Sequence, residues 1–231
     1  MAAAGGDPGR IESMVARRCQ GEPLAWIVGR VPFAGALVAV SPGVYVPRHQ
    51  TEALVRMAAR ALPPAGRAVD LCTGSGAVAV ALQSARPDAT VVATELDPTA
   101  CECARVNGVE VYQGDLDRPL PAGWAGSTDV VTAVAPYVPT GELQYLPRDV
   151  LAYEPRAALD GGPGGTVLLE RVVAAAARLL RPGGILIVEL GADQDDRLAP
   201  VLSGAGFTGV ETSVDDDGDL RALRARWHPG L

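Results

Sequence analysis

The stretch VDLCTGSGAVAVAL, residues 69–82, decides the fold. The apolar residues up to Cys72 are typical of the end of a strand, and the Ala- and Val-rich run after Gly76 is typical of a helix. Gly74 and Gly76 permit a tight turn and let a ligand approach the backbone N–H groups at the helix N-terminus. A dinucleotide-binding loop is the alternative, but its G-x-G-x-x-G fingerprint is met only if Ala79 stands for the last glycine.

Strand and helix patterns alternate outward from this loop. Short connections between alternating strands and helices predict right-handed crossovers and a mainly parallel sheet. Pro182-Gly183-Gly184 predicts the end of the last long helix, and Asp216-Asp217-Gly218 predicts the turn of a hairpin within residues 206–227. The predicted strands lie in residues 67–72, 89–96, 109–115, 128–134 and 184–191, and the predicted helices are 77–85, 98–108 and 166–180. The predicted fold class is therefore α/β, with a mostly parallel sheet that ends in a C-terminal antiparallel hairpin.

Residues 1–55 are predicted to be a short N-terminal extension of the main domain, which we place at residues 56–231. Residues 9–20 are typical of a short helix. The following segment has the Gly and Pro turns of a β-hairpin, and a further helix is predicted to open near Thr51. A segment of this size buries too little surface to fold by itself.

Composition favours a soluble protein that does not bind nucleic acid. The chain has 231 residues, 48% of them hydrophobic, with a formal charge of −7 and a pI near 4.9. Phosphate binding rests on clusters of Lys and Arg, so this acidic balance disfavours a polyanionic partner. No apolar run approaches the roughly 20 residues of a membrane helix, and no secretory signal pattern is present. A cytoplasmic protein without a membrane partner is the prediction.

The residue types also exclude some catalytic classes. All 20 basic residues are Arg, which excludes Schiff-base chemistry on Lys and a P-loop lysine. The cysteines Cys19, Cys72, Cys101 and Cys103 are irregularly spaced and lack the second pair or the histidines of a zinc site. Free thiols and no metal are predicted.

Three acidic residues lie at the ends of predicted strands, where the loops begin. Glu95, which lies 19 residues beyond Gly76, can accept hydrogen bonds from both hydroxyls of a ribose, and Asp115 can bond the amino group of an adenine. Together with Asp70 they suit a cationic ligand better than NAD, whose diphosphate they would repel. S-adenosylmethionine meets that description. The alternatives are a loop cap for Asp70, a surface charge for Glu95 and a turn residue for Asp115.

Eight segments complete the pattern, in the order PLAWIVGRVPFAG, VSPGVYVPRHQTEALV, VDLCTGSGAVAVAL, ELDP, GDLDRPLP, APYVPT, YEPRAALDGGPGG and LRPGGILIVELG. In these segments the chain resembles the protein-(glutamine-N5) methyltransferases, the family whose best-known members methylate peptide-chain release factors. The resemblance spans roughly residues 20–228. It implies a seven-stranded, Rossmann-like class I methyltransferase sheet and S-adenosylmethionine as cofactor. It also implies a substrate pocket lined by the segments around Pro47 and Tyr137.

Two departures from the family concern the methyl acceptor. The family carries an N-terminal helical domain that helps to dock the release factor, whereas only about 20 residues precede the matching region here. In the family's Asn-Pro-Pro-Tyr motif, the Asn side chain and the next carbonyl hold the amide, but this chain has Val134-Ala135-Pro136-Tyr137. Val134 accepts no hydrogen bond, and an unsatisfied amide N–H costs roughly 1–3 kcal/mol, or about one to two decades in rate.

We therefore predict a methyltransferase with a changed acceptor, such as a small molecule with a hydroxyl, carboxylate, thiol or amine group. Carbonyls of Ala135 and Pro136 and the ring of Tyr137 would serve catalysis. The predicted base is Glu52, Glu154 or His49. The alternatives are N5 methylation of a glutamine in a release factor or similar protein, and cofactor binding without methyl transfer. The missing Asn, whose side chain would accept a hydrogen bond, and the acidic charge disfavour an adenine methyltransferase of nucleic acids.

The predicted site residues form two sets. The cofactor-binding set is Asp70, Cys72, Gly74, Gly76, Glu95, Leu96, Asp115, Leu116 and Val134. The substrate set is Arg48, His49, Thr51, Val134, Tyr137 and Glu154. Alternative roles remain open for three of them: a solvated loop position for His49, packing for Tyr137 and a structural carboxylate clamp for Arg48.

Overall fold

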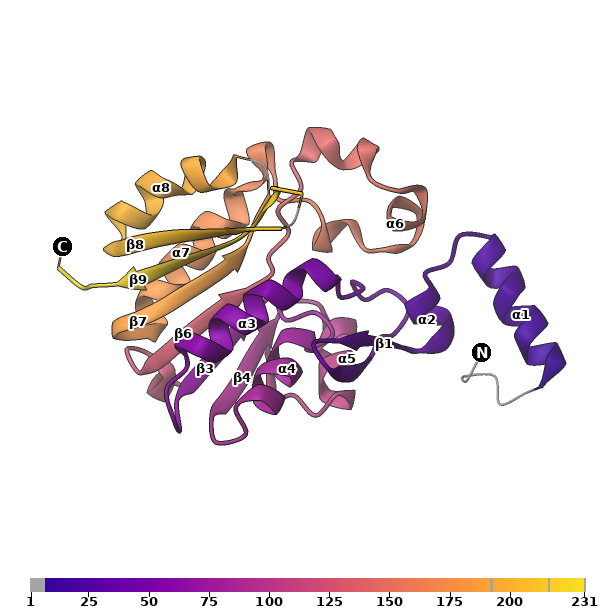
Figure 1. Cartoon of the computed structure of the whole chain (residues 1–231), viewed down its shortest axis with the longest axis horizontal. Helices are drawn as coiled ribbons and strands as arrows, with labels where there is room; N and C mark the ends of the chain where they lie inside the picture. Colours follow the sequence, from indigo (N-terminus) through magenta and orange to yellow (C-terminus); the bar gives the residue numbers. More distant parts are fainter. Residues whose placement is uncertain (1–6, 192, 216, 231) are drawn as a thin grey trace.

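One seven-stranded sheet forms the centre of the molecule (Figure 1). The computed structural model describes residues 7–191, 193–215 and 217–230. The strands are β3 (Arg67–Leu71), β4 (Thr90–Glu95), β5 (Val111–Gln113), β6 (Thr128–Ala133), β7 (Leu180–Glu189), β8 (Phe207–Val214) and β9 (Leu220–Trp227). Their order is β5-β4-β3-β6-β7-β9-β8. Strands β3 to β7 are parallel, and β9 is antiparallel to its neighbours β7 and β8.

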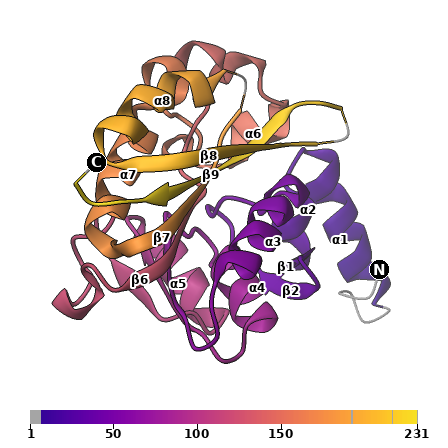
Figure 2. The ribbon, with the colours of Figure 1, turned by 60° about the vertical axis from the view of Figure 1, so that its left-hand side comes forward.

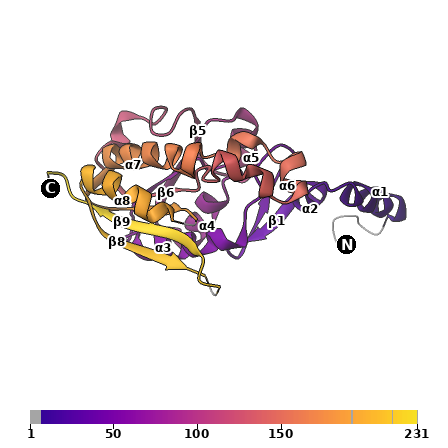
Figure 3. The ribbon, with the colours of Figure 1, turned by 90° about the horizontal axis from the view of Figure 1, so that it is seen from above.

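Helices cover both faces of this sheet (Figure 3). On one face lie α3 (Glu52–Ala61) and α4 (Ala77–Ala85), and on the other lie α7 (Val167–Leu179) and α8 (Gln194–Gly204). Successive strand residues point to opposite faces. Ala68 therefore belongs to the apolar cluster with α3 and α4, whereas Val69 belongs to the cluster with α7 and α8. Burial on both faces is what a parallel sheet requires.

The strand order reverses between β3 and β6, which are neighbours although β4 and β5 lie between them in the chain. Open α/β sheets bind their ligands beyond the carboxyl ends of the strands at such a point. Leu71 pairs with Ala133 in this register. The glycine loop that follows β3 and the Val134–Tyr137 motif that follows β6 therefore begin side by side.

The N-terminal segment packs against this body through a hairpin. It contains α1 (Pro8–Cys19), α2 (Leu24–Val28), and the strands β1 (Arg30–Phe33) and β2 (Ala36–Ala39), which lie beside α4 (Figure 2). Asn107 follows α5 (Pro98–Val106) and fastens β2, because it accepts from the Ala39 N–H at 2.8 Å and donates to the Ala39 carbonyl at 2.9 Å. Helix α1 buries no residue and extends away from the sheet (Figure 1).

Most of the predicted elements are present, but four points need comment. The long helix ends at Leu179, before Pro182-Gly183-Gly184, because Leu180 already pairs with Thr128 at the start of β7. Helix α8, which contains Pro200, was not predicted. The hairpin between β8 and β9 is confirmed, although Asp216 of its predicted turn lies outside the described residues. Helix α3 crosses the boundary predicted at residue 55, so the two-part division stays a prediction.

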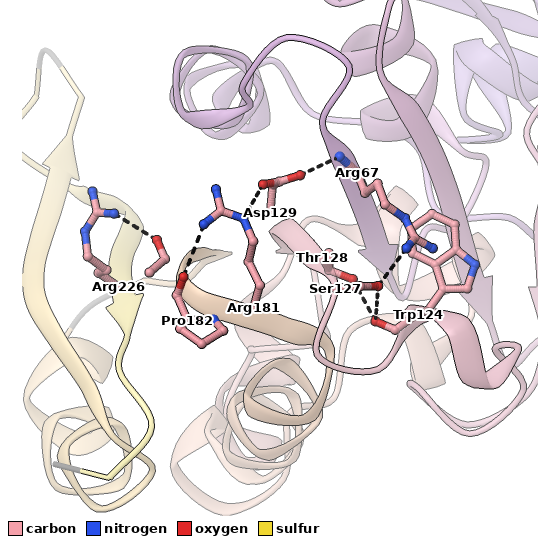
Figure 4. A network of polar contacts seen from close by, with 9 residues as sticks. Arg67, Trp124, Ser127, Thr128, Asp129, Arg181, Pro182 and Arg226 are labelled. Atoms are coloured by element: carbon pink, nitrogen blue, oxygen red, sulfur yellow. Dashed lines mark hydrogen bonds and ion pairs between the residues drawn. The ribbon is translucent and has the colours of Figure 1, made fainter.

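A polar network joins the strands at the end of the sheet opposite the glycine loop (Figure 4). Asp129 Oδ2 accepts from the backbone N–H of Arg67 at 2.8 Å, and Asp129 Oδ1 accepts from Arg181 Nε at 2.6 Å. The Arg67 guanidinium lies 4.0 Å from the centre of the Trp124 ring and donates to Ser127 Oγ at 2.7 Å. Asp129 thus connects the first residue of β3 to the start of β7.

We expect Asp129→Ala to lower the free energy of unfolding by about 1–3 kcal/mol, because a backbone N–H and a guanidinium lose their acceptor. Urea denaturation measures this effect. The matched control is Glu102→Ala, which breaks the exposed pair with Arg105 at 3.5 Å and should cost no more than about 1 kcal/mol. Equal effects of the two substitutions would contradict this role for Asp129.

Among the described residues, no helix has the length and apolar character needed to cross a bilayer.

Candidate active site

A cavity of about 800 Å³ opens at the point where the strand order reverses. The wall opposite the strands comes from the segment after β6, which includes α6 (Arg148–Tyr153). Of the predicted residues, those that line the cavity are Asp70, Cys72, Gly74, Glu95, Leu96, Asp115, Leu116, Arg48, Thr51, Val134, Ala135, Pro136 and Tyr137. Sequence positions that lie far apart in the chain thus meet around one space.

The two glycines of the loop have different functions. Gly74 lines the cavity with φ +57°, and its N–H donates to Glu95 Oε2 at 2.8 Å. Gly76 was predicted to bind the cofactor, but it does not line the cavity. It caps α4 with φ +83°, and a Cβ there would lie 2.7 Å from Val109 Cγ2. Gly76 is therefore needed for close packing between α4 and the segment before β5.

Glu95 is held by three backbone donors at the end of β4. Besides the Gly74 N–H on Oε2, its Oε1 accepts from the N–H groups of Leu96 at 2.7 Å and Asp97 at 2.9 Å. An ionised carboxylate has about four acceptor positions. Glu95 therefore fixes the glycine loop against β4 and keeps capacity for a ligand donor on the cavity side.

Asp70 is buried at the carboxyl end of β3, 1% exposed. Its oxygens accept from Thr73 Oγ1 at 2.5 Å and Thr132 Oγ1 at 2.7 Å. Burial raises the pKa of Asp70 to about 6, although the two hydroxyls oppose that rise. The alternative that Asp70 caps the loop is thus supported by its bond to Thr73, while its side chain still reaches the cavity wall.

Because its pKa is raised, the contribution of Asp70 to stability falls as pH rises. In the unfolded chain the carboxyl titrates near 3.8, so its ionisation in the folded state is penalised progressively between about pH 4 and pH 6. The rise in the pKa from 3.8 to about 6 corresponds to about 3 kcal/mol of folding stability. We expect Asp70→Asn to remove this decline, which thermal unfolding of both proteins from pH 4 to pH 7 would measure. Parallel pH curves for the two proteins would contradict the assignment.

Asp115 is turned towards an arginine at the other end of the cavity. Arg171 Nη2 of α7 donates to both Asp115 oxygens at 2.7 Å, and Arg171 also lines the cavity. Arg118 Nη1 lies 3.5 Å from Asp115 Oδ2. The guanidinium of Arg171 orients the carboxylate that was predicted to meet the adenine amino group.

Cys72 occupies a position in the glycine loop that favours glycine. Its φ is +56°, in the left-handed region that side chains rarely adopt. The thiol lines the cavity, and burial raises its pKa, so it is neutral at physiological pH. The cysteines of the described residues are free thiols, and these residues contain no group of His, Cys, Asp and Glu suited to a metal ion.

The acceptor end of the cavity is formed by the segment after β6. Val134 is half-buried against the cluster of α3 and α4, and it presents no polar side-chain atom to the cavity. Ala135 is 1% exposed, so only its backbone and a methyl group are near the space. The Tyr137 ring lies on the same wall, and its hydroxyl donates to Glu189 Oε1 at 3.0 Å.

Arg48 is clamped at this end by a buried carboxylate. Glu154 accepts from Arg48 Nη2 and from the Val46 N–H, the latter at 3.1 Å, and its side chain is 2% exposed. The Arg48 guanidinium lies 4.9 Å from the centre of the Tyr45 ring. This geometry fits the clamp alternative for Arg48. Glu154 does not line the cavity, so a substrate or base role for it has no geometric support.

Glu52 and His49 also lie away from the cavity lining. Glu52 Oε1 accepts from the Ala34 N–H at 3.1 Å and faces His49 Nδ1 at 3.1 Å, at the start of α3. The His49 side chain is 77% exposed. The helix start thus turns His49 towards solvent and Glu52 towards the turn between β1 and β2, and the predicted base roles would require both side chains to move. The solvated loop position for His49 fits its exposure.

Four residues that support the acceptor end were missed by the sequence reasoning: Glu189, Gln194, Gly161 and Gly165. Glu189 lies in LRPGGILIVELG and the two glycines lie in YEPRAALDGGPGG, but no pattern in these segments shows a contact with Tyr137, and Gln194 lies outside both of them. Gly161 approaches so closely that a Cβ there would lie 2.8 Å from the Pro136 carbonyl oxygen. Only the folded chain brings these groups together.

The sheet order, the helices on both faces and the cavity beyond β3, β4 and β6 define a class I methyltransferase. A ribosomal protein L11 methylase from Lactobacillus delbrueckii subsp. bulgaricus has the same fold, with a TM-score of 0.58 at 17% identity over 82% of this chain and 84% of that one. The Mtq2–Trm112 complex of E. cuniculi, responsible for methylation of the eRF1 termination factor, gives a TM-score of 0.55 at 23% identity over 80% of this chain and 99% of that one. These identities show the fold alone.

Sequence similarity identifies the family. The release factor glutamine methyltransferase of Geobacter sulfurreducens is 39% identical over 92% of this chain and 76% of that protein. The corresponding protein of Mycolicibacterium smegmatis is 39% identical over 93% of this chain and 78% of that protein. No family model matches the chain. The chain belongs to the release factor glutamine methyltransferase family, and it is an S-adenosylmethionine-dependent methyltransferase.

Proposed function

We propose that this enzyme transfers the methyl group of S-adenosylmethionine to an acceptor other than a protein glutamine. The observation that carries the proposal is Val134 on the cavity wall, where the family motif has an Asn side chain. Without the hydrogen-bond acceptor of the Asn side chain, an amide loses the bond that holds it and localises its lone pair. A more nucleophilic group needs no such help.

The lining of the cavity fits the cofactor. Five acidic side chains, Asp70, Glu95, Asp97, Asp115 and Asp149, line it with two arginines, Arg48 and Arg171, so a cation is favoured there. When bound, S-adenosylmethionine supplies a methyl group made electrophilic by its sulfonium. We propose that Glu95 accepts from the ribose hydroxyls and that Asp115, oriented by Arg171, accepts from the adenine amino group.

The acceptor end can position a nucleophile without a dedicated base. Backbone carbonyls of Ala135 and Pro136 can accept from a hydroxyl or amine, and the Tyr137 ring encloses the reacting atoms. Methyl transfer is an in-line displacement, so alignment supplies much of the rate. The products are the methylated acceptor and S-adenosylhomocysteine, and the proton of a hydroxyl, thiol or amine acceptor passes to solvent. The acceptor that fits best is a small molecule with a hydroxyl, carboxylate, thiol or amine group. We also propose a cytoplasmic location and the division into an extension, residues 1–55, and a methyltransferase domain, residues 56–231.

The second candidate is N5 methylation of a protein glutamine. It is favoured by the 39% identity to two release factor glutamine methyltransferases over more than nine-tenths of this chain. In that case the carbonyls of Ala135 and Pro136 alone would hold the amide. The rate would be lower by about one to two decades for the missing bond.

The test uses the full chain, cofactor labelled in its methyl group, and two sets of acceptors. One set is a bacterial release factor with its Gly-Gly-Gln segment, and the other is a panel of small alcohols, thiols, carboxylic acids and amines. We expect label in the panel and at most weak labelling of the protein. Efficient labelling of the glutamine would overturn the proposal, and so would tight cofactor binding by calorimetry without transfer to any acceptor.

A further inference from the structure

Two side chains behind the cavity wall bind Tyr137, one at its hydroxyl and the other at its backbone carbonyl. Its hydroxyl donates to Glu189 Oε1 at 3.0 Å, and its backbone carbonyl accepts from Gln194 Nε2 at 2.7 Å. Glu189 is the last residue of β7 and Gln194 is the first of α8. Neither of them lines the cavity. One connection at the end of β7 therefore fixes a side chain that does line it.

The Glu189 carboxylate is shielded from solvent, so water could not replace a protein contact that was lost there. It is 3% exposed, and no residue in the described part of the chain partners its buried Oε2 at hydrogen-bond geometry. Thr51 Oγ1 is also buried and has no formed bond to any residue that the structure describes, yet it lies close enough to lower the pKa of Glu189, which burial raises. The charges of Arg221 and Arg48 act in the same direction as Thr51. Loss of this carboxylate would leave the half-buried Tyr137 hydroxyl without the acceptor that it has now.

Gln194 holds the backbone of the motif in a fixed orientation. It is 2% exposed, and its Oε1 accepts from the Gly191 N–H at 3.0 Å. With Oε1 occupied in this way, the Nε2 donors point towards Tyr137. A buried amide with both of its ends bonded does not rotate freely.

We propose that Glu189 is a positioning residue for methyl transfer, because it sets the place of the Tyr137 ring at the acceptor end while Gln194 fixes the backbone of the same residue. The proposal rests on the proposed function only in placing Tyr137 at the acceptor end, and it does not depend on which acceptor is used. Since Val134 provides no side-chain anchor, the ring and the neighbouring carbonyls carry the alignment. Their support from β7 then determines how well the reacting atoms are aligned.

The first test reads Tyr137 directly by fluorine NMR of the full chain labelled with 3-fluorotyrosine. The chain has five tyrosines, and the Tyr137 signal is assigned by its loss in Tyr137→Phe. We expect Glu189→Leu to shift and broaden this signal and Glu189→Gln, whose amide oxygen still accepts, to restore it. A Tyr137 signal that is unchanged in Glu189→Leu would overturn the proposal.

The second test separates positioning from cofactor binding. Affinity for S-adenosylhomocysteine, measured by calorimetry, should stay within about twofold in both variants, because Glu189 does not touch the cavity. With a Gly-Gly-Gln release factor as acceptor, Glu189→Leu should lower kcat by about tenfold and Glu189→Gln should recover it. Where the release factor accepts no methyl group, the fluorine signal alone decides, so failure of the acceptor proposal is distinguished from failure of this one.

A variant that removes both partners keeps the proposal testable if Glu189→Leu does not fold. Glu189→Leu with Tyr137→Phe leaves no unpaired hydroxyl, so it should be more stable than Glu189→Leu alone. Equal or lower stability of the double variant would show that the two residues are not coupled and would overturn the proposal.

Discussion

Replacement of Glu95 by Leu should abolish measurable binding of S-adenosylhomocysteine, with an affinity loss of at least about 100-fold, or about 3 kcal/mol. Two losses combine in this variant. The N–H groups of Gly74, Leu96 and Asp97 lose their common acceptor, so the glycine loop is no longer fixed against β4. The ribose hydroxyls also lose the carboxylate that we propose as their acceptor, and hydrogen bonds to charged groups contribute about 1.5–3 kcal/mol each. Isothermal calorimetry measures the change.

Glu110→Gln is the matched control for this prediction. It removes the same charge near the neighbouring strand, where Glu110 accepts from the Tyr112 hydroxyl at 2.5 Å but does not line the cavity. Its affinity should stay within about threefold of the unmodified chain. Glu95→Gln keeps one acceptor oxygen, so its affinity for S-adenosylhomocysteine should lie between those of Glu95→Leu and Glu110→Gln. A Glu95→Leu protein that binds as well as the control would contradict the site.

The substitution Gly165→Ala should cost about 3 kcal/mol of folding free energy and displace the acceptor motif. Gly165 has φ +74°, where a side chain is strained. A Cβ there would overlap the Tyr137 carbonyl oxygen and the Gln194 amide nitrogen, so backbone would have to move. For a chain of this size, that cost corresponds to a fall in Tm of about 6–12 °C. Scanning calorimetry measures it.

Gly141→Ala is the control for the glycine prediction. Gly141 lies in the same segment after β6 and is exposed, and a Cβ added there would meet nothing within 4 Å. The substitution should leave Tm within about 2 °C of the unmodified protein, as surface substitutions usually do. The same Tm for Gly165→Ala and Gly141→Ala would show that the close approach is not needed.

The parts of this molecule that could be predicted from sequence are those with local signals. The stretch at residues 69–82 contains the end of a strand, two turn glycines and the start of a helix within 14 residues. The fold class and the cofactor end of the cavity could therefore be predicted from this stretch. Glu95 ends β4 and Asp115 lies two residues after β5, and parallel strands bring their carboxyl ends together. These residues line the cavity as predicted, whereas their roles towards the cofactor stay predictions.

The acceptor end of the cavity was harder to predict because the residues that contact one another there are distant in the chain. The Tyr137 hydroxyl meets Glu189, 52 residues further on, and Arg48 meets Glu154 across 106 residues. Glu52 and Glu154 have the residue type of a base, but type alone does not show that one faces His49 and the other lies buried beneath Arg48. Gly76 shows the converse, since a glycine in a binding loop can serve packing alone.

The change of acceptor is tested most directly by restoring the family motif and measuring methyl transfer to one glutamine. The substitutions Val134→Asn and Ala135→Pro, made together, return the motif to Asn-Pro-Pro-Tyr. We expect this variant to label the Gly-Gly-Gln glutamine of a release factor about 10 to 100 times faster than the unmodified chain, at equal affinity for S-adenosylhomocysteine. Efficient labelling by the unmodified chain, with no gain in the variant, would contradict a changed acceptor.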